Sequence, residues 1–347
     1  MATRNNAPYL REALDTLLGQ TFPDFELIVV DDGSTDHTQQ ILGSYRDPRL
    51  VPLRNDQRRG VAAARNRTIA ASRARLIAVA DADDRYDLRR LERQVVFLQE
   101  HPAVDIAVSD FYKMTAGGQV FERVRIPRTD AQIKFNFLWQ SPLSHPTALC
   151  RRDAVLRSGG YDESFSSAVD TDWFARMSDY GTFGVLPEPL HYYRKYSSST
   201  SENHDPAQEQ RRFCISHRLV CKYLGREISD SQGVALRDLL CAYKAVAPGQ
   251  LDSALALLGN LLHRARERES VVTWHWIRRR VSSSLLAQSK NLSYVAPRLS
   301  RQVLCKAISL DWRCAAGRAA WLQTARLLAA RIRGKIPGQQ ARDGVRP

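Results

Sequence analysis

Two acidic clusters, each placed directly after a short apolar run, constrain the fold of this chain more than any other feature. The run at 25–30 leads into Asp31-Asp32-Gly33-Ser34-Thr35-Asp36, and the run at 76–80 leads into Asp81-Ala82-Asp83-Asp84. Each apolar run predicts a buried strand, and in an open α/β sheet ligands bind just beyond the carboxyl ends of the strands. Carboxylates gathered there repel one another unless a cation or the donors of a ligand lie between them. The pattern therefore predicts a site for a metal-held nucleotide diphosphate, because ordinary turn and cap residues account for one such cluster but poorly for two.

The periodicity of apolar residues predicts an alternating β/α series followed by helices. We expect strands at 25–31, 50–53, 76–80 and 104–109, and helices at 9–20, at 35–45 with Ser34 or Asp36 as its cap, after Gly60, and at 87–100. This alternation implies a parallel sheet with right-handed crossovers. Beyond Pro127, helices near 130–139 and 170–179 and strands near 147–151 and 183–194 predict an α+β cap over the sheet. From about residue 205 the pattern is helical, so we predict a first domain over 1–204 and a helical C-terminal region over 205–347.

Composition narrows the class of protein. The 347 residues, 44% hydrophobic and 25% charged, have the proportions of a globular protein. No run approaches the roughly eighteen uninterrupted apolar residues of a membrane span, and residues 1–6 lack the apolar core of a signal peptide. The six cysteines show no C-x-x-C pair and no metal-ligand spacing, which indicates reduced thiols in a cytoplasmic setting.

The net charge of +14 is concentrated at the C-terminal end. Residues 271–347 carry fifteen Lys and Arg against two acids, which leaves the first 270 residues at about +1. The segment 318–333 is amphipathic at helical spacing, and Trp274, Trp276 and the triplet 278–280 add to it. Two uses fit this basic tail: a helix on an anionic membrane surface, which would place the protein at the inner face of a membrane, or a helix packed on the protein with a solvated basic face. No nucleic-acid-binding motif accompanies the charge, so a nucleic-acid partner is not expected.

A series of further motifs carries a family resemblance. In order, they are the stretch from Tyr9 to Asp36, residues 60–66, Asp81-Ala82-Asp83-Asp84, Arg151-Arg152-Asp153, Gly159 to Phe165, and Asp170-Thr171-Asp172-Trp173. In combination they resemble the family-two glycosyltransferases of the GT-A fold, a Rossmann-like α/β fold with a mixed sheet. The resemblance covers about 60% of the chain, the first two hundred positions. A lone D-x-D would be a weak signal, whereas D-x-D within this series is specific.

The resemblance implies a role for each acidic residue at the strand ends. Such enzymes move a sugar from a nucleotide-diphosphate donor to an acceptor hydroxyl, with inversion at the anomeric carbon. By resemblance, Asp32 bonds the nucleotide base with Asp31 supporting it, Asp81 contacts the ribose or the sugar, Asp83 ligates Mg²⁺ or Mn²⁺, and Asp84 shapes the site. A hard divalent cation with oxygen ligands suits a leaving diphosphate. For Arg65 two readings stay open, a place near the diphosphate or a salt bridge to one of the aspartates.

An inverting displacement also needs a carboxylate that removes the acceptor proton. Asp170 matches the base of the family, and Asp172 is the neighbouring alternative. Positions i and i+2 on a helix point in different directions, so only one of the two faces the acceptor. We favour Asp170, although a carboxylate placed at a helix N-terminus by the dipole would fit either residue.

The chain departs from the pattern of the family at four places. Residues 1–5 align with the end of the family's opening strand, and an absent central strand leaves unpaired backbone groups inside the protein, so we expect about five to ten further residues before Met1. Val169 stands where relatives often carry an acid. The run 194–196 lacks a histidine that relatives place after an arginine, and His191 reads as a strand residue rather than a substitute ligand. Thr68 replaces a glycine.

Three functions are compatible with these features. The first is an active glycosyltransferase that builds a surface polysaccharide, with a nucleotide-diphosphate sugar, UDP-sugar favoured, as donor and a glycan or lipid-linked acceptor. The second is a catalytically silent relative that binds nucleotide-sugars or acts as a scaffold; Val169 and the short N-terminal strand favour it. The third is a nucleotidyltransferase on a similar sheet, but the Gly-rich, basic loop that such enzymes carry after the first strand is not visible here.

Overall fold

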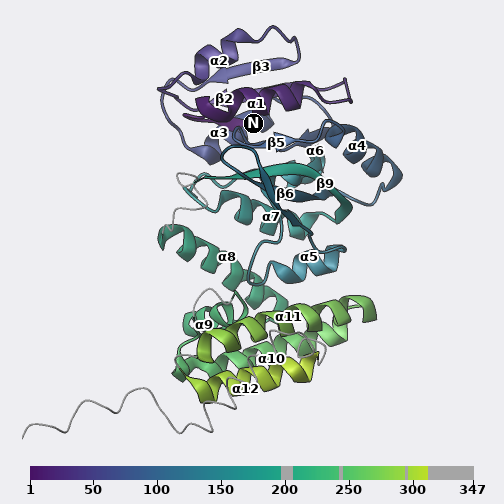
Figure 1. The fold of residues 1–347 in the computed structure, drawn as a ribbon. Helices are drawn as coiled ribbons and strands as arrows, with labels where there is room; N and C mark the ends of the chain where they lie inside the picture. Colours follow the sequence, from purple (N-terminus) through teal and green to yellow (C-terminus); the bar gives the residue numbers. More distant parts are fainter. Residues whose placement is uncertain (197–205, 242–244, 294–295, 312–347) are drawn as a thin grey trace, which may run out of the picture. The chain divides into compact units, whose positions relative to one another are not determined.

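The computed structural model describes residues 1–196, 206–241, 245–293 and 296–311. The chain divides into two compact units, Met1–Lys222 and Tyr223–Pro347 (Figure 1). The amphipathic segment predicted at 318–333 lies outside the described residues. Within the described ranges, no helix is both long enough and apolar enough to cross a membrane.

A three-stranded parallel sheet carries the first acidic cluster. Its strand order is β1 (Ala2–Thr3), β2 (Leu27–Asp31) and β3 (Leu50–Arg54). Every residue of β2 is buried, as expected for a strand covered on both faces. Ala2 pairs with Val30 and also forms a parallel bridge with Asp81. The short β1 therefore brings the two acidic clusters to the same edge.

Helices alternate with these strands as predicted. They are α1 (Ala7–Leu18), α2 (Thr38–Ser44) and α3 (Val61–Ala71). Neither residue considered as the cap of α2 holds that position: the N-cap is His37, whose side chain makes no capping bond. Asp36, one residue earlier, accepts the Thr38 N–H at 3.0 Å through its Oδ1. Ser34 instead accepts the Asn5 N–H at 3.0 Å and ties the first loop to the N-terminal segment.

The second sheet is mixed, and it corrects two expectations. Its order is β4 (Leu76–Ala78), β8 (Leu149–Arg151), β6 (Ile106–Thr115), β9 (Phe183–Lys195) and β5 (Arg85–Tyr86), with β7 (Val120–Val124) paired to β6. β8 runs antiparallel to β4 and β6, whereas β6 and β9 are parallel. The strands predicted up to 109 do share one direction, because β4 and β6 both run antiparallel to β8. The expectation of a purely parallel sheet is wrong, because β8 lies between β4 and β6 and makes the sheet mixed. The segments near 147–151 and 183–194, predicted as part of a cap, are strands of this sheet.

Five helices complete the first unit: α4 (Arg90–Glu100), α5 (Asp130–Asn136), α6 (Arg152–Arg157), α7 (Val169–Tyr180) and most of α8 (Pro206–Leu224). Three side chains of α8 bond to earlier parts of this unit. Ser216 donates to the Leu138 carbonyl, Arg218 lies 3.2 Å from Asp172, and Lys222 lies 2.5 Å from Asp179. The unit therefore extends to Lys222, beyond the boundary predicted at 204.

The second unit is helical in its described part, as the apolar periodicity predicts. Its helices are α9 (Asp230–Cys241), α10 (Leu251–Arg268), α11 (Val271–Ser293) and α12 (Pro297–Leu310), with a 3₁₀ turn at Pro248–Gln250. Buried serines join α11 to α12: Ser282 donates to the Ala307 carbonyl at 2.7 Å, and Ser289 donates to the Ser300 carbonyl at 3.0 Å. Small side chains let the two helices approach closely.

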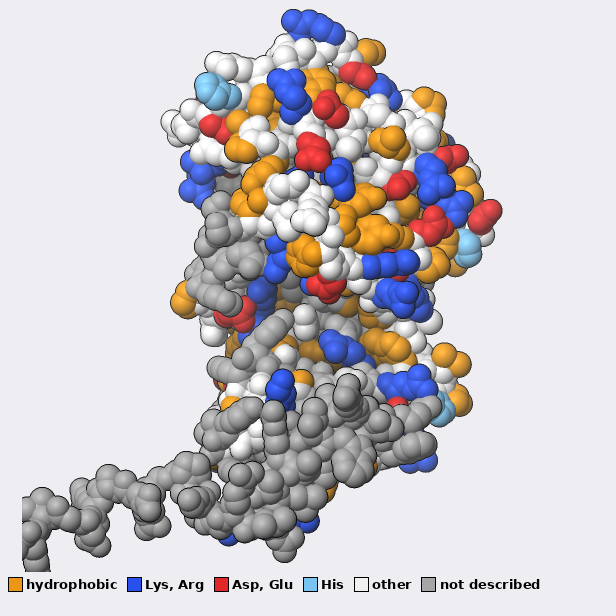
Figure 2. Space-filling view, viewed as in Figure 1, with side chains coloured by type: hydrophobic (Ala, Val, Ile, Leu, Met, Phe, Trp, Pro, Cys, Tyr) orange, Lys and Arg blue, Asp and Glu red, His pale blue; other side chains and the backbone are white. Residues whose placement is uncertain are grey.

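The surface of the first unit carries charges of both signs. In the view of Figure 2, acidic and basic side chains are interspersed there with apolar groups. This agrees with a nearly neutral sequence over the first 270 residues. The excess of positive charge therefore gives no reason to expect a polyanion site on this unit.

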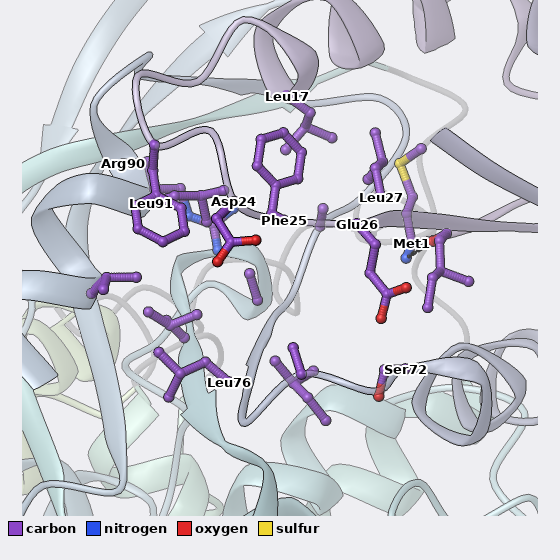
Figure 3. A pocket seen from close by; sticks show the side chains of 18 of the residues that line it. Met1, Leu17, Asp24, Phe25, Glu26, Leu27, Ser72, Leu76, Arg90 and Leu91 are labelled. Carbon is purple, nitrogen blue, oxygen red and sulfur yellow. Dashed lines mark hydrogen bonds between the residues drawn. The ribbon is translucent and has the colours of Figure 1, made fainter. Parts of the chain in front are cut away.

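A cavity of about 310 Å³ lies inside the first unit, between β2 and β4. Figure 3 shows Met1, Phe25, Leu27 and Leu76 around it. β4 pairs with β8 on its other side, and β1 covers β2 only from Met1 onward. The Met1 amino group is buried and donates to the Ile28 carbonyl at 2.8 Å. This part of the sheet is therefore a slot one strand wide, which β1 fills only at its end.

Candidate active site

The first acidic cluster, at the end of β2, is held by its own loops. Asp32 is buried and accepts three hydrogen bonds, from Asn55 Nδ2 at 2.7 Å and from the N–H groups of Arg59 and Gly60 at 2.8 Å each. Gly60 has φ +97°, a conformation that favours glycine. Asp32 thus fixes the loop before α3, a structural task that the sequence did not reveal. The predicted contact of Asp32 with a base stays a prediction.

Asp31 differs from Asp32 in having one free oxygen. Its Oδ1 accepts the Ser34 N–H at 2.9 Å. Its Oδ2 is buried and has no hydrogen-bond partner in the described part of the chain. Because an unpartnered buried acceptor is costly, this oxygen is the one most ready to accept a bond from a ligand or a water.

Asp81 opens the second cluster and is paired with Arg65 of α3. Arg65 Nη2 lies 2.8 Å from Asp81 Oδ1, so of the two alternatives for Arg65 the structure has the salt bridge. Burial raises the pKa of Asp81, but the charge of Arg65 and the neighbouring His145 outweigh it, and the pKa lies well below its usual range. The charge of Arg65 also acts on Asp170. Arg65 therefore links the strand end to the helix that carries the predicted base.

Asp83 and Asp84 point to different partners. Asp84 is buried; its Oδ2 lies 2.7 Å from His191 Nε2, and its Oδ1 accepts the Arg194 N–H at 2.8 Å. Burial raises the pKa of Asp84 and lowers that of His191 to about 3, so both directions favour an uncharged pair. Asp83 accepts a bond from the Tyr196 hydroxyl at 2.8 Å. Burial, with Asp84 and Asp81 nearby, raises the pKa of Asp83 to about 7.

The end of β9 supports this acidic turn. Arg194 donates from Nε to the Asp83 carbonyl at 2.7 Å and forms an ion pair with Glu12 of α1. Its guanidinium lies 4.7 Å from the ring centroid of Tyr9, whose ring lies 4.9 Å from that of Tyr196. His191 is a strand residue, as expected, and it also holds Asp84. No local signal in the sequence pointed to these contacts, because β9 is distant from the acidic turn along the chain.

Asp170 and Asp172, in the first turn of α7, are clearly distinguished. Asp172 is buried and bonded by Arg176 Nε at 2.7 Å and by Arg218 NH2 at 3.2 Å. Asp170 is half-buried and makes no hydrogen bond or ion pair within the described residues. Asp172 is therefore committed to holding α7 and α8 together, and Asp170 keeps its oxygens for other partners. The helix follows Ala168, which has φ +55°.

His145 is a site residue that the sequence analysis missed. It lies in the 3₁₀ turn His145–Thr147 before β8, and only 4% of it is exposed. Its Nδ1 is 3.7 Å from Asp81, and its Nε2 is 2.8 Å from the Tyr161 hydroxyl. A single histidine before an apolar strand is an ordinary core residue in sequence, so only the fold reveals its place beside Asp81.

The residues fit a divalent cation that has one protein carboxylate as a ligand and takes the others from a bound substrate. Within the described part of the chain, no group of three or more His, Cys, Asp or Glu is arranged to hold a metal ion. Asp83 offers a hard carboxylate with one oxygen bonded to Tyr196 and the other without a partner in the described residues. Oxygen ligands of this kind suit Mg²⁺ or Mn²⁺, which are commonly held by one or two carboxylates together with substrate phosphates. A cation on Asp83 would need the diphosphate of a ligand.

Acidic residues lie at the ends of β2 and β4, and α7 carries a carboxylate without a partner in the described residues, an arrangement that agrees with the predicted class, a transferase on an α/β sheet. Residues 1–158 match the sequence model of Glycosyl transferase family 2. The family match thus covers residues 1–158 of the first unit, and the predicted enzyme class, a glycosyltransferase, is confirmed.

Known proteins that resemble the chain agree with this family. An uncharacterized glycosyltransferase of Methanocaldococcus jannaschii is 28% identical over 201 residues, 56% of this chain and 69% of that protein. The Escherichia coli UDP-Glc:alpha-D-GlcNAc-diphosphoundecaprenol beta-1,3-glucosyltransferase WfaP is 30% identical over 112 residues, 32% of this chain and 44% of its own length. Proteins of Mycobacterium tuberculosis match over 57% of their length. The chain thus spans between less than half and about two thirds of these relatives.

A solved structure confirms the fold. TarS of S. aureus, residues 1–349 in complex with UDP-GlcNAc, has a TM-score of 0.56 at 19% identity, over 87% of this chain and 88% of that chain. The fold of this protein is therefore the mixed α/β sheet predicted from the resemblance, with the helical C-terminal region predicted from the periodicity. At such low identity the likeness shows the fold alone.

Proposed function

We propose that this protein is an inverting, metal-dependent glycosyltransferase that moves a sugar from a nucleotide-diphosphate donor to an acceptor hydroxyl in cell-surface polysaccharide biosynthesis. The arrangement of Asp81, Asp83 and Asp170 carries the proposal. The first two lie at the sheet edge where ligands of such folds bind. The third is a carboxylate without a partner in the described residues, and the charge of Arg65 reaches both Asp81 and Asp170.

On the donor side, the aspartates at the two strand ends bind different parts of the nucleotide-sugar. Asp31 and Asp32 face the base, Asp81, steadied by Arg65, faces the ribose or the sugar, and Asp83 holds Mg²⁺ or Mn²⁺. When bound, the cation neutralises the charge that develops on the departing diphosphate. A UDP-sugar is the favoured donor, because the name of WfaP specifies UDP-Glc and TarS was solved with UDP-GlcNAc. Asp84 does not touch the donor in this proposal; bonded to His191, it holds the turn that presents Asp83.

On the acceptor side, Asp170 is the base. It takes the proton from the acceptor hydroxyl, whose oxygen forms a bond to the anomeric carbon. The bond from that carbon to the diphosphate oxygen breaks, and its electron pair leaves with the diphosphate. Attack from the face opposite the leaving group inverts the anomeric centre. Asp172 cannot serve without losing its bonds to Arg176 and Arg218.

The acceptor is proposed to be a glycan or a lipid-linked sugar. The name of WfaP specifies a sugar linked through a diphosphate to undecaprenol, and an acceptor of that kind would lie at a membrane. Contact with the inner face of a membrane through the basic tail stays a prediction, since residues 318–333 are outside the described part. So does the cytoplasmic setting.

The test is thermal stabilisation of the purified protein by UDP, GDP, TDP and CDP, each with and without Mn²⁺. A shift with one nucleotide, present only with the metal and lost in Asp83→Ala, is the expected result. Asp153→Asn, a change of an exposed carboxylate on α6, is the matched control and should keep the shift. Binding without sugar transfer to any glycan or lipid-linked acceptor would favour the silent scaffold instead. The absence of any shift in the unaltered protein would refute both.

A further inference from the structure

A buried chain of side chains connects the donor edge of the sheet to the helix of the proposed base. His145 lies in the middle, with Nδ1 3.7 Å from Asp81 Oδ1 and Nε2 2.8 Å from the Tyr161 hydroxyl. The imidazole is packed edge-on against the rings of Trp173 and Phe174, with centroids 5.7 and 6.0 Å away. Its Nδ1 is buried and makes no hydrogen bond in the described part of the chain.

The bonding pattern indicates which nitrogen of His145 carries the proton. Burial, followed by the charge of Arg65, lowers the pKa of His145, so the ring is neutral. Burial raises the pKa of the Tyr161 phenol, so its O–H remains and donates to Nε2. A neutral imidazole that accepts at one nitrogen carries its proton on the other. The Nδ1–H of His145 therefore faces the carboxylate of Asp81.

Helix α3 holds Tyr161, which lies at the other end of this series of buried side chains. Asn66 Nδ2 donates to the Tyr161 carbonyl, and Asn66 Oδ1 accepts the Tyr161 N–H, both at 2.8 Å. Arg65, the neighbour of Asn66, pairs with Asp81 and lies 5.5 Å from the centroid of the Tyr161 ring. The Tyr161 ring in turn packs against Trp173 at 4.9 Å, one turn of α7 after the predicted base. Two adjacent residues of α3 thus hold both ends.

We propose that His145 is a positioning residue that sets the carboxylate of Asp81 for the donor and, through Tyr161, sets helix α7 for the acceptor. The inference rests on the proposed function of Asp81 and Asp170. The distance of 3.7 Å from Nδ1 to Asp81 is longer than a hydrogen bond, so the proposal is that the Nδ1–H faces the carboxylate and bonds it when the donor binds, as is common for catalytic hydrogen bonds. Second partners that orient a functional carboxylate are known to affect affinity and activity by about 10- to 100-fold in metal sites.

Two substitutions separate the two nitrogens of His145. His145→Asn places an amide near the position of Nδ1, so it keeps a donor for Asp81 and loses the partner of Tyr161. His145→Gln reaches the position of Nε2, so it keeps the partner of Tyr161 and loses the donor for Asp81. Tyr161→Phe, which removes a single oxygen, is the milder companion of the first variant.

The measurements are the dissociation constant for UDP with Mn²⁺ by calorimetry, kcat and KM for sugar transfer, and the melting temperature. We expect His145→Gln to weaken the binding of UDP by about 10-fold or more, because the donor that faces the charged carboxylate of Asp81 is lost. We expect His145→Asn and Tyr161→Phe to bind UDP within about 3-fold of the unaltered protein while kcat falls about 10-fold or more, a loss that matches other positioning partners.

Three outcomes would overturn the inference. If all variants bind UDP and turn over like the unaltered protein, His145 positions nothing. If UDP affinity and kcat fall equally in His145→Gln and His145→Asn, and the melting temperature falls with them, His145 is only a packing residue. If Tyr161→Phe behaves like His145→Gln, the assignment of the two nitrogens is wrong. An unaltered protein that binds no nucleotide at all refutes the proposed function itself, which keeps the two failures distinct.

Discussion

The slot between β2 and β4 predicts that apolar residues joined to the amino group of Met1 stabilise the protein. Ala2 is level with Val30 on one side and Asp81 on the other. Counting back along the same register, four added residues reach the level of Leu76, where β4 begins. An added strand would therefore run between two strands that are already in place and pair with both in the parallel sense.

The expected change in the free energy of unfolding has three main sources: the filled cavity, the ordering of the added residues, and the buried amine. Filling 310 Å³ gains at most about 7 kcal/mol at roughly 24 cal/mol per Å³. Ordering four residues costs about 4 to 8 kcal/mol, so these two terms nearly cancel. The new backbone hydrogen bonds contribute about 1 kcal/mol each. Burial also lowers the pKa of the Met1 amine from 8.0 to about 5, a penalty of about 1.4 kcal/mol at pH 7 that an amide does not carry. With even one such hydrogen bond the sum exceeds about 2 kcal/mol, so we expect the free energy of unfolding to rise by at least about 2 kcal/mol.

The assay is urea and thermal unfolding of three proteins: the chain itself, the chain with Val-Ile-Val-Ile before Met1, and the chain with Ser-Gly-Ser-Gly there. The apolar extension should raise the melting temperature by about 4 to 8 °C for a unit of this size. Because the folded amine has the lower pKa, the unfolded chain binds more protons between pH 5 and 8, and the stability of the unextended protein should rise over that range. Both extensions should remove this slope. An apolar extension no more stabilising than Ser-Gly would refute the strand slot.

Four further substitutions test the site and its support. Asp170→Asn should lower kcat by about 10²- to 10⁴-fold and leave the affinity for UDP unchanged. Asp172→Asn should chiefly lower the melting temperature. Steady-state kinetics and calorimetry test both, and equal behaviour of the two variants would contradict the assignment of the base. Tyr196→Phe removes one bond from Asp83 and should change Mn²⁺ affinity, measured by titration with UDP present, by several-fold up to about 10-fold. Asp110→Asn, at a carboxylate with no exposed surface that two arginines bind, should cost about 3 kcal/mol in urea unfolding, and a cost near zero would contradict it.

The sequence predicts the first half of the fold better than the second, for a physical reason. Strands such as β2 are apolar throughout and are bounded by turn residues, and both signals are local. The direction in which β8 and β9 join the sheet is not local. It depends on partners such as β4 and β6, which lie at least forty residues away in the case of β8. The sequence therefore predicts β8 and β9 as parts of a cap, because nothing in their composition shows that they join the sheet or in which direction.

The candidate site, like the fold, could be predicted from the sequence only in part. Carboxylates at strand ends could be named from the sequence, since consecutive residues after an apolar run must emerge at one edge. Their partners could not. His191 meets Asp84 across 107 positions, and His145 meets Asp81 from a turn without any distinctive motif. The choice of Asp170 over Asp172 was made by resemblance, and only the ion pairs of Asp172 supply a physical argument for it.

Three aspartates within four positions raise a problem of charge, and the protein solves it differently for each. Asp81 receives an internal cation, Arg65. Asp84 is withdrawn from the surface, paired with His191, and favoured in an uncharged form. Asp83 receives neither: its side-chain partner in the described residues is the phenol of Tyr196, which donates a bond without adding a positive charge. A cation that balances an ionised Asp83 would therefore have to come from a ligand or the solvent, which is the reason to assign the predicted metal to this aspartate and to neither of the other two.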